Sequence, residues 1–204
     1  MTWWLPHVPR SAPGRPAPGS VNRASKWRGA NDFYPTPKGA IVALRDLGIL
    51  PERVWEPACG NGAISKVLEL SGHAVVSTDL CDYGFGEAGV DFLLEPRLRA
   101  PAIVTNPPFH IANEFVDHAL RMDPEIACFF LRLKFLEGRR RYEMLMKNRP
   151  PAEVHVFIER VKFFSGDHAE AEQPGWNTEA FAWFVWRRGV VSSPRIHWIS
   201  RGAS

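Results

Sequence analysis

The stretch RVWEPACGNGAISKVLEL, residues 53–70, indicates how this chain folds. Residues 53–56 predict a short strand, the proline and glycines of residues 57–62 predict a turn, and residues 62–70 carry apolar side chains at helical spacing. A glycine turn between a strand and a helix is typical of parallel α/β sheets, whose ligands bind at the carboxyl ends of the strands. Glycines also let a ligand approach the backbone closely. The turn is therefore a predicted binding site.

Strand and helix patterns alternate along the rest of the chain. Helical spacing predicts further helices at residues 36–47, 111–121 and 137–146. Runs of β-branched and aromatic residues predict further strands at residues 74–78, 102–105, 126–133, 154–158 and 181–186. This alternation indicates a single α/β domain, residues 29–204, with a mostly parallel sheet covered by helices.

The charge is uneven along the chain, although its net value is only +3 at pH 7. Residues 1–50 hold seven Lys and Arg against two Asp and Glu, residues 51–130 five against twelve, and residues 131–204 thirteen against eight, or +5, −7 and +5. An acidic middle between basic flanks is typical of a protein whose ends meet a polyanion. The apolar content of 45% excludes wholesale disorder, and no apolar run is long enough to span a membrane.

Residues 1–28 are rich in Pro, Gly, Ser and Arg and contain no acidic residue. This composition predicts a disordered tail, or alternatively a basic arm that touches nucleic-acid phosphate. The three cysteines are widely spaced and odd in number, so they form no disulfide framework and no zinc pair. We therefore expect a reducing cytoplasm and no metal site.

The glycine turn favours a particular kind of cofactor. Asp79 ends the next strand about twenty residues on, where a carboxylate accepts hydrogen bonds from ribose hydroxyls. Ser65 stands where a dinucleotide motif has its third glycine. Glu56 would repel a pyrophosphate but suits a cofactor that carries a sulfonium and an ammonium. These residues favour a phosphate-free, cationic nucleoside cofactor.

The tetrapeptide Asn106-Pro107-Pro108-Phe109 is the most specific feature of the sequence. Two prolines cannot continue a central strand, so the chain must form a rigid corner at the carboxyl end of residues 102–105. The side-chain oxygen of Asn106 and the carbonyl of Pro107 could accept the two hydrogens of an exocyclic amino group and favour a tetrahedral nitrogen. Phe109 could stack on an extruded base. The alternative is a proline turn with a phenylalanine in the core.

These residues resemble the class I S-adenosylmethionine-dependent DNA adenine-N6 methyltransferases, most closely the compact phage and prophage members. The family's Asn/Asp-Pro-Pro-aromatic signature is matched by residues 106–109, and its glycine motif by residues 56–62. The resemblance implies a Rossmann-like fold with a mostly parallel, seven-stranded sheet and helices on both faces. It also implies the cytoplasm of a bacterial or phage-infected cell.

The resemblance assigns roles to individual residues. Tyr34 and Thr36 belong to a motif near the methionine part of the cofactor, and Asp79 would hold the ribose. Asp91 and Phe92 resemble the third-strand motif, whose acid takes the cofactor's adenine amino group while the aromatic residue lines its ring. The predicted residues that bind S-adenosylmethionine are Tyr34, Thr36, Glu56, Pro57, Ala58, Gly60, Gly62, Asp79, Leu80, Asp91 and Phe92.

No segment after residue 186 is large enough for a separate target-recognition domain. The irregular stretch at residues 160–178 and the basic run after residue 131 are the predicted substitutes, with Arg139, Arg140, Lys162 and Trp176 as candidate nucleic-acid contacts. The alternatives are a solvated helix face for the arginines and edge-strand packing for the aromatic residues.

The sequence predicts an enzyme that transfers a methyl group from S-adenosylmethionine to N6 of a flipped adenine in double-stranded DNA. Two alternatives in the same class stay open, an RNA adenine-N6 and a protein-glutamine N5 methyltransferase, because an amide nitrogen poses a similar chemical problem. An alternative of another class is a non-catalytic, nucleic-acid-binding accessory subunit.

Overall fold

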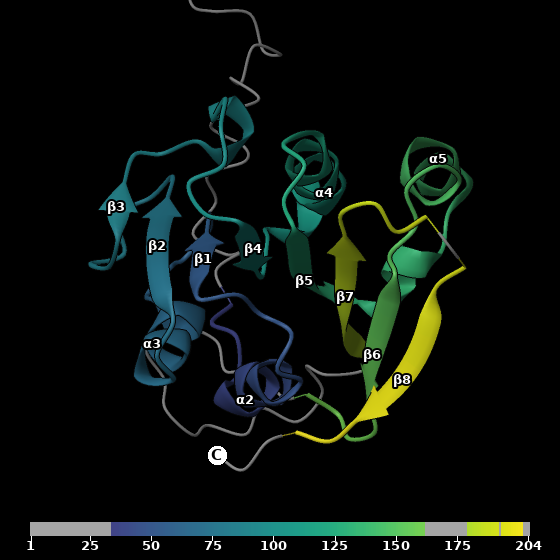
Figure 1. The fold of residues 1–204 in the computed structure, drawn as a ribbon, viewed down its shortest axis with the longest axis horizontal. Helices are drawn as coiled ribbons and strands as arrows, with labels where there is room; N and C mark the ends of the chain where they lie inside the picture. The colour runs from purple at the N-terminus through teal and green to yellow at the C-terminus, as the bar shows by residue number, and fades with distance from the viewer. Residues whose placement is uncertain (1–33, 162–178, 192, 202–204) are drawn as a thin grey trace, which may run out of the picture. The chain divides into compact units, whose positions relative to one another are not determined.

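A computed structural model describes residues 34–161, 179–191 and 193–201 of the chain. The described strands form one sheet in the order β3-β2-β1-β4-β5-β7-β6-β8 (Figure 1). Their bounds are β1 Arg53–Glu56, β2 Ala74–Asp79, β3 Glu87–Ala88, β4 Ala102–Thr105, β5 Ile126–Arg132, β6 Glu153–Phe157, β7 Phe181–Arg187 and β8 Arg195–Ile199. Strand β7 runs antiparallel to both of its neighbours, and the other described pairings are parallel.

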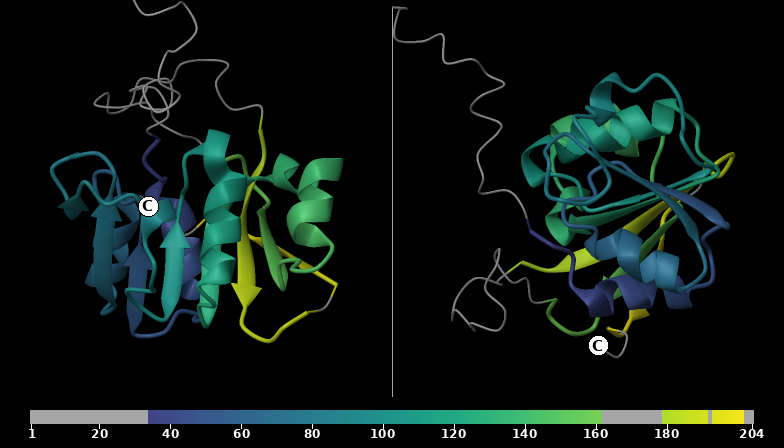
Figure 2. Two further views of the ribbon diagram at one scale, coloured as in Figure 1. Left: turned by 90° about the horizontal axis from the view of Figure 1, so that it is seen from above. Right: turned by 90° about the vertical axis from the view of Figure 1, so that its left-hand side faces the viewer.

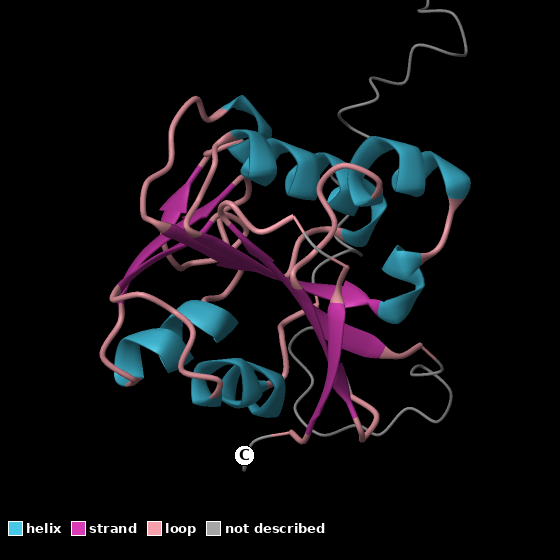
Figure 3. Cartoon of the chain, turned by 45° about the vertical axis from the view of Figure 1, so that its right-hand side comes forward, coloured by secondary structure: helices cyan, strands magenta, loops and turns pink. Residues whose placement is uncertain are grey.

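Helices cover both faces of the sheet (Figures 2 and 3). The α-helices are α2 Lys38–Asp46, α3 Ala63–Leu70, α4 Ala112–Arg121 and the short α5 Arg139–Arg141, which continues into a π-helical turn, η4 Tyr142–Met146. Three 3-10 turns, η1 Phe92–Leu94, η2 Phe109–Ile111 and η3 Leu133–Leu136, complete the list. Helices α2 and α3 pack in one apolar cluster, and α4 and η4 in a second.

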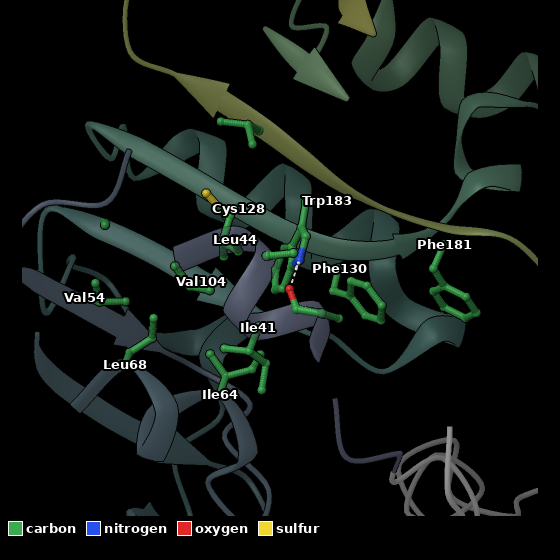
Figure 4. Close-up of a cluster of buried hydrophobic side chains, with 14 of the residues drawn as sticks. Ile41, Leu44, Val54, Ile64, Leu68, Val104, Cys128, Phe130, Phe181 and Trp183 are labelled. Carbon is green, nitrogen blue, oxygen red and sulfur yellow. Dashed lines mark hydrogen bonds between the residues drawn. The ribbon is translucent and has the colours of Figure 1, made fainter. Parts of the chain in front are cut away.

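The two apolar clusters lie on opposite faces of the sheet and share its central strands. In β5, Ile126, Cys128 and Phe130 belong to the cluster with α2 and α3, while the three residues between and after them belong to the cluster with α4. Strand β7 alternates in the same way. The indole of Trp183 in β7 donates a hydrogen bond of 2.8 Å to the carbonyl of Ala40 in α2 (Figure 4). Burial on both faces explains why these two strands are continuously apolar.

The predicted Rossmann-like α/β fold is confirmed, but the sheet has eight strands rather than seven. Strand β8 was not predicted, although residues 195–198 alternate polar and apolar side chains; it lies at the sheet edge, where four of its five residues are exposed. Residues 91–93, which resemble a third-strand motif, are not a strand. The Asp91 carboxylate accepts a hydrogen bond of 3.0 Å from the Leu93 amide and begins η1, a local turn that competes with strand pairing.

The helix predicted over residues 137–146 begins later than expected, at Arg139. Gly138 has a φ of 106°, which is incompatible with a right-handed helix, so the α-helix cannot begin before Arg139. The residues before Gly138 form the separate turn η3. The predicted tail, residues 1–28, lies outside the described residues.

Candidate active site

The predicted site residues come together because the strands that carry them are parallel. Glu56 ends β1, Asp79 ends β2, and Asn106 directly follows β4. Strand β1 lies between the other two, with Glu56 level with Ser77 of β2 and Trp55 level with Ile103 of β4. The glycine turn, the acid of β2 and the Asn-Pro-Pro-Phe corner therefore meet at the carboxyl ends of these strands.

The carboxylate of Asp79 is held in place by the backbone on both sides. One oxygen accepts a hydrogen bond from the amide of Gly60 and the other from the amide of Cys81, each 2.8 Å long. Burial raises the pKa of Asp79, although these hydrogen bonds oppose the shift. Each carboxylate oxygen has a second lone pair, so the pre-oriented acid can still accept hydroxyl groups of a ligand.

Glu56 has a structural role in the glycine turn. Its side chain is only 2% exposed, and Oε2 accepts hydrogen bonds from the amide of Ser65, at 2.8 Å, and from its hydroxyl. Burial raises the pKa of Glu56 to about 8, so the carboxyl is mostly protonated at pH 7. Glu56 was expected to attract a cationic cofactor by its charge. In the structure its side chain is mostly neutral and offers almost no surface to a ligand.

The ring of Phe85 covers the second glycine of the turn, a contact that the sequence did not predict. Gly62 has a φ of +79°, and a Cβ at this position would lie 2.5 Å from a ring carbon of Phe85. The ammonium of Lys66 lies 4.9 Å from the centre of the same ring. Phe85 is in a stretch of seven residues that links the parallel strands β2 and β3 without a helix. Such a short link is unusual between parallel strands and has no local sequence signal other than its glycines.

The amide of Asn106 is oriented by a segment 72 residues away in the chain. Its Nδ2 donates a hydrogen bond of 3.0 Å to the carbonyl of Tyr34, and the ring of Tyr34 stacks on Phe109 with 5.9 Å between the ring centres. The Oδ1 atom of Asn106 is buried and accepts no hydrogen bond from the described residues. A buried acceptor without a donor is costly, so this oxygen is available to a donor from outside the described residues.

The other residues of the corner are also ordered. Pro107 is buried, and the carbonyl of Pro108 accepts a hydrogen bond of 3.1 Å from Ile111 at the start of α4. Phe109 packs against Phe181, with 5.7 Å between the ring centres, and the guanidinium carbon of Arg132 lies 4.3 Å from the centre of the Phe109 ring. Arg132 belongs to the basic run after residue 131, which the sequence predicted to meet a nucleic acid, although it was not among the individually named contacts. Its contact with Phe109 was not predicted.

The remaining predicted cofactor residues differ in how much surface they offer. Leu80 is 53% exposed, whereas Thr36 is buried. Phe92 is 2% exposed and packs against Trp55 and Phe115 in the core, so it offers almost no surface to a cofactor ring. The described placement therefore favours the exposed Leu80 over Phe92 as a surface for a ligand.

The basic run after β5 contains two kinds of arginine. The side chains of Arg139 and Arg140 are exposed and make no hydrogen bond or ion pair with the described residues. Arg141, by contrast, donates to Asn113 and to the carbonyls of Lys134, Phe135 and Glu137. Arg139 and Arg140 thus stay candidates for phosphate contacts, while Lys162 and Trp176 lie outside the described residues.

In the described ranges, no three or more His, Cys, Asp or Glu side chains gather in a way that could hold a metal ion. None of the helices in these ranges has both the length and the apolar character needed to cross a membrane.

Solved structures of methyltransferases have a similar fold. A protein from Pyrococcus horikoshii assigned as an RNA methyltransferase superposes with a TM-score of 0.54 at 11% identity, over 74% of this chain and 82% of the other. The fold is a class I methyltransferase fold. A protein from Agrobacterium tumefaciens assigned as an O-methyltransferase matches with a TM-score of 0.50 at 12% identity, over 81% and 86% of the two chains.

A third similar structure is the modification subunit of a protein from Vibrio vulnificus assigned as a type I restriction enzyme. It matches with a TM-score of 0.53 at 16% identity and covers 87% of this chain. The chain spans only 49% of that subunit. No protein-family model and no curated protein matches the sequence.

Proposed function

We propose that this protein transfers a methyl group from S-adenosylmethionine to the exocyclic N6 amino group of adenine in DNA. The observation that carries the proposal is the buried, unpartnered Oδ1 of Asn106, whose amide is oriented by the carbonyl of Tyr34. An oxygen held in this way is an acceptor for an N–H group of the substrate. Asn106 also lies at the carboxyl ends of the parallel strands, where class I folds bind their ligands.

The nitrogen to be methylated needs activation, because its lone pair is delocalised into the adenine ring. The Oδ1 atom of Asn106 would accept one of its hydrogens, and the carbonyl of Pro107 the other. Pro107 follows β4 in a rigid corner, and its carbonyl accepts no hydrogen bond from the described residues. Two fixed acceptors favour a tetrahedral nitrogen whose lone pair points along the line of attack, so catalysis comes from orientation and from hydrogen bonds that strengthen in the transition state.

The glycine turn and the end of β2 fit S-adenosylmethionine. Bound there, the cofactor supplies an electrophilic methyl group. Asp79, which its bonds to Gly60 and Cys81 hold in place, would accept the ribose hydroxyls, and the exposed Leu80 would cover the adenine. Gly60 has a positive φ and no side chain, so its backbone would allow close approach of the cofactor, whereas the Phe85 ring fills the space beside Gly62.

Two observations support a nucleic acid as the substrate. The similar structures include one assigned as an RNA methyltransferase and one modification subunit of a type I restriction enzyme. Arg139 and Arg140 leave two exposed charges on the segment that follows β5. An RNA adenine or a glutamine side chain presents the same kind of nitrogen, so the substrate test must include all three classes.

The test of the catalytic role compares Asn106→Ala with Asn148→Ala, which alters an exposed asparagine. We expect Asn106→Ala to lower methyl transfer from labelled cofactor to DNA by roughly 100-fold or more, because one oriented acceptor is lost. Calorimetric binding of S-adenosylmethionine should change little in Asn106→Ala and weaken in Asp79→Ala. Full transfer activity in Asn106→Ala would refute the proposal.

The test of the substrate class incubates labelled cofactor separately with DNA, RNA and a ribosomal extract. We expect label in DNA, and N6-methyladenine by mass spectrometry in the DNA of a host that expresses the protein. Label confined to RNA or to ribosomal protein would assign the activity to one of the other two classes. Cofactor binding without transfer to any of them would indicate an accessory subunit.

A further inference from the structure

Arg132 lies directly on the aromatic residue of the Asn-Pro-Pro-Phe corner. It is the last residue of β5, pairs with Phe181 across the sheet, and its guanidinium carbon lies 4.3 Å from the centre of the Phe109 ring. We call this arrangement, in which the Arg132 guanidinium lies over the Phe109 ring, the Arg132 cap. A guanidinium is planar and stacks on aromatic faces, so on the face that it covers it takes the place of a stacked base.

The Arg132 cap is held by a single carboxylate. Nε of Arg132 lies 2.6 Å from Oε2 of Glu179, and both side chains are 42% exposed. Nε is buried and has no hydrogen-bond partner among the described residues, so this ion pair lacks hydrogen-bond geometry. An exposed ion pair and an exposed cation–aromatic contact are both weak. Arg132 can therefore leave the ring at little cost.

Two other arginines, one after β5 and one at the far end of β7, are bound more firmly. Arg141 donates hydrogen bonds to Asn113 and to three backbone carbonyls, and Arg187 donates to the buried carboxylate of Glu153 at 3.1 Å. The guanidinium of Arg132 has five N–H donors and makes no hydrogen bond with the described residues. Nε is buried beside Glu179, so the donors available to an oxyanion are those of the two Nη atoms.

We propose that Arg132 is a substrate-recognition residue, which binds a phosphate of the target nucleotide in place of Glu179 and leaves the Phe109 ring so that the base can stack there. This inference rests on the proposed function. Phosphate suits the guanidinium because it can accept two parallel N–H bonds. A glutamine side chain carries no phosphate and cannot displace Glu179, so the Arg132 cap selects a nucleotide over a peptide amide.

The chain offers a matched control at the other end of the same strand pair. Arg188 follows β7, and its backbone amide donates to the carbonyl of Glu125 just before β5. Its side chain pairs with the Asp123 carboxylate at 3.0 Å and also donates hydrogen bonds to the Asp123 carbonyl. Both arginines are thus partly exposed and each pairs with one carboxylate. Arg188→Gln and Arg132→Gln each remove one positive charge, but only the second removes it from the proposed site.

The test measures binding of a fluorescein-labelled DNA duplex to the full chain at several salt concentrations. If Arg132 contacts one phosphate, Arg132→Gln lowers the slope of log affinity against log salt by about 0.9 and weakens binding about eightfold near 0.1 M salt. Arg188→Gln should leave the slope unchanged. Arg132→Lys should keep the slope, because it keeps the charge. Equal slopes for Arg132→Gln and Arg188→Gln would overturn the inference.

A second comparison tests the competition between phosphate and Glu179. Glu179→Gln removes the carboxylate that pairs with Arg132. Asp123→Asn removes the one that pairs with Arg188 but keeps the hydrogen bonds of Arg188 to the Asp123 carbonyl. We expect tighter DNA binding by several-fold in Glu179→Gln and no comparable gain in Asp123→Asn. Equal effects of the two substitutions would contradict the role of Glu179. Thermal unfolding of each variant identifies any loss of binding that is due to misfolding.

Failure of this inference and failure of the proposed function give different results. If the chain methylates DNA but Arg132→Gln behaves like Arg188→Gln in both the salt slope and the KM for DNA, only the role of Arg132 is wrong. If the chain methylates no nucleic acid but Arg132→Gln still lowers the salt slope, the phosphate contact stands without the proposed reaction. Methyl transfer to a glutamine peptide that Arg132→Gln leaves unchanged would exclude both.

Discussion

Replacing Glu56 by glutamine should stabilise the protein, and more so as the pH rises. Glu56 is buried at the end of β1, and its pKa is raised from 4.5 to about 8. Between these two values the unfolded chain releases the proton of Glu56 while the folded chain retains it. The folded state therefore binds more protons, and the free energy of unfolding falls as the pH rises through this window.

The size of the effect follows from the two pKa values. Each pKa unit corresponds to about 1.4 kcal/mol, so Glu56 costs the folded state about 3 kcal/mol at pH 7 and about 5 kcal/mol well above pH 8. Below pH 4.5 the cost vanishes, because the carboxyl is protonated in both states. A glutamine keeps an oxygen that can accept the two hydrogen bonds from Ser65 and carries no titrating group.

The assay is urea denaturation of the wild type and Glu56→Gln at several pH values. The free energy of unfolding of the variant relative to the wild type should increase by about 3 kcal/mol between pH 5 and pH 8. Taking the difference cancels every other group that titrates equally in both proteins. Glu52→Gln, on an exposed residue just before β1, is the control. A difference that stays constant or decreases with pH would refute the reasoning.

Two further predictions concern the glycine turn and the thiols. Gly62→Ala should destabilise the fold by about 2–4 kcal/mol in urea denaturation, because the new Cβ meets the Phe85 ring at positive φ, whereas Gly72→Ala, also at positive φ but in open space, should cost only about 1–2 kcal/mol. Equal losses would exclude the ring contact. Of the three thiols only the partly exposed Cys81 should react rapidly with Ellman's reagent in the native state, because Cys59 is buried with its pKa raised to about 12 and the third is also buried. Rapid titration of a second thiol, or of any thiol in Cys81→Ser, would contradict this.

The fold class and the place of the candidate site could both be predicted from the amino-acid sequence. Local patterns account for this, since the glycine turn at residues 57–62 and the prolines of residues 106–109 stop strands where the chain must turn. The continuous apolar runs at β5 and β7 mark strands that are covered on both faces. Because the carboxyl ends of parallel strands lie together, the sequence also predicted that Asp79 and Asn106 lie at the same end of the strands.

The pairing and charge of the candidate site residues, by contrast, depend on how the chain packs. The bond from Asn106 to Tyr34 and the contact of Arg132 with Phe109 join segments distant in the chain, so no local pattern reports them. The sequence indicated a charged Glu56, but the protonation of a carboxyl depends on its burial, and burial depends on what packs around it. Desolvation and long-range contacts are properties of the packed chain, and for that reason they became visible only when the strands and helices were assembled.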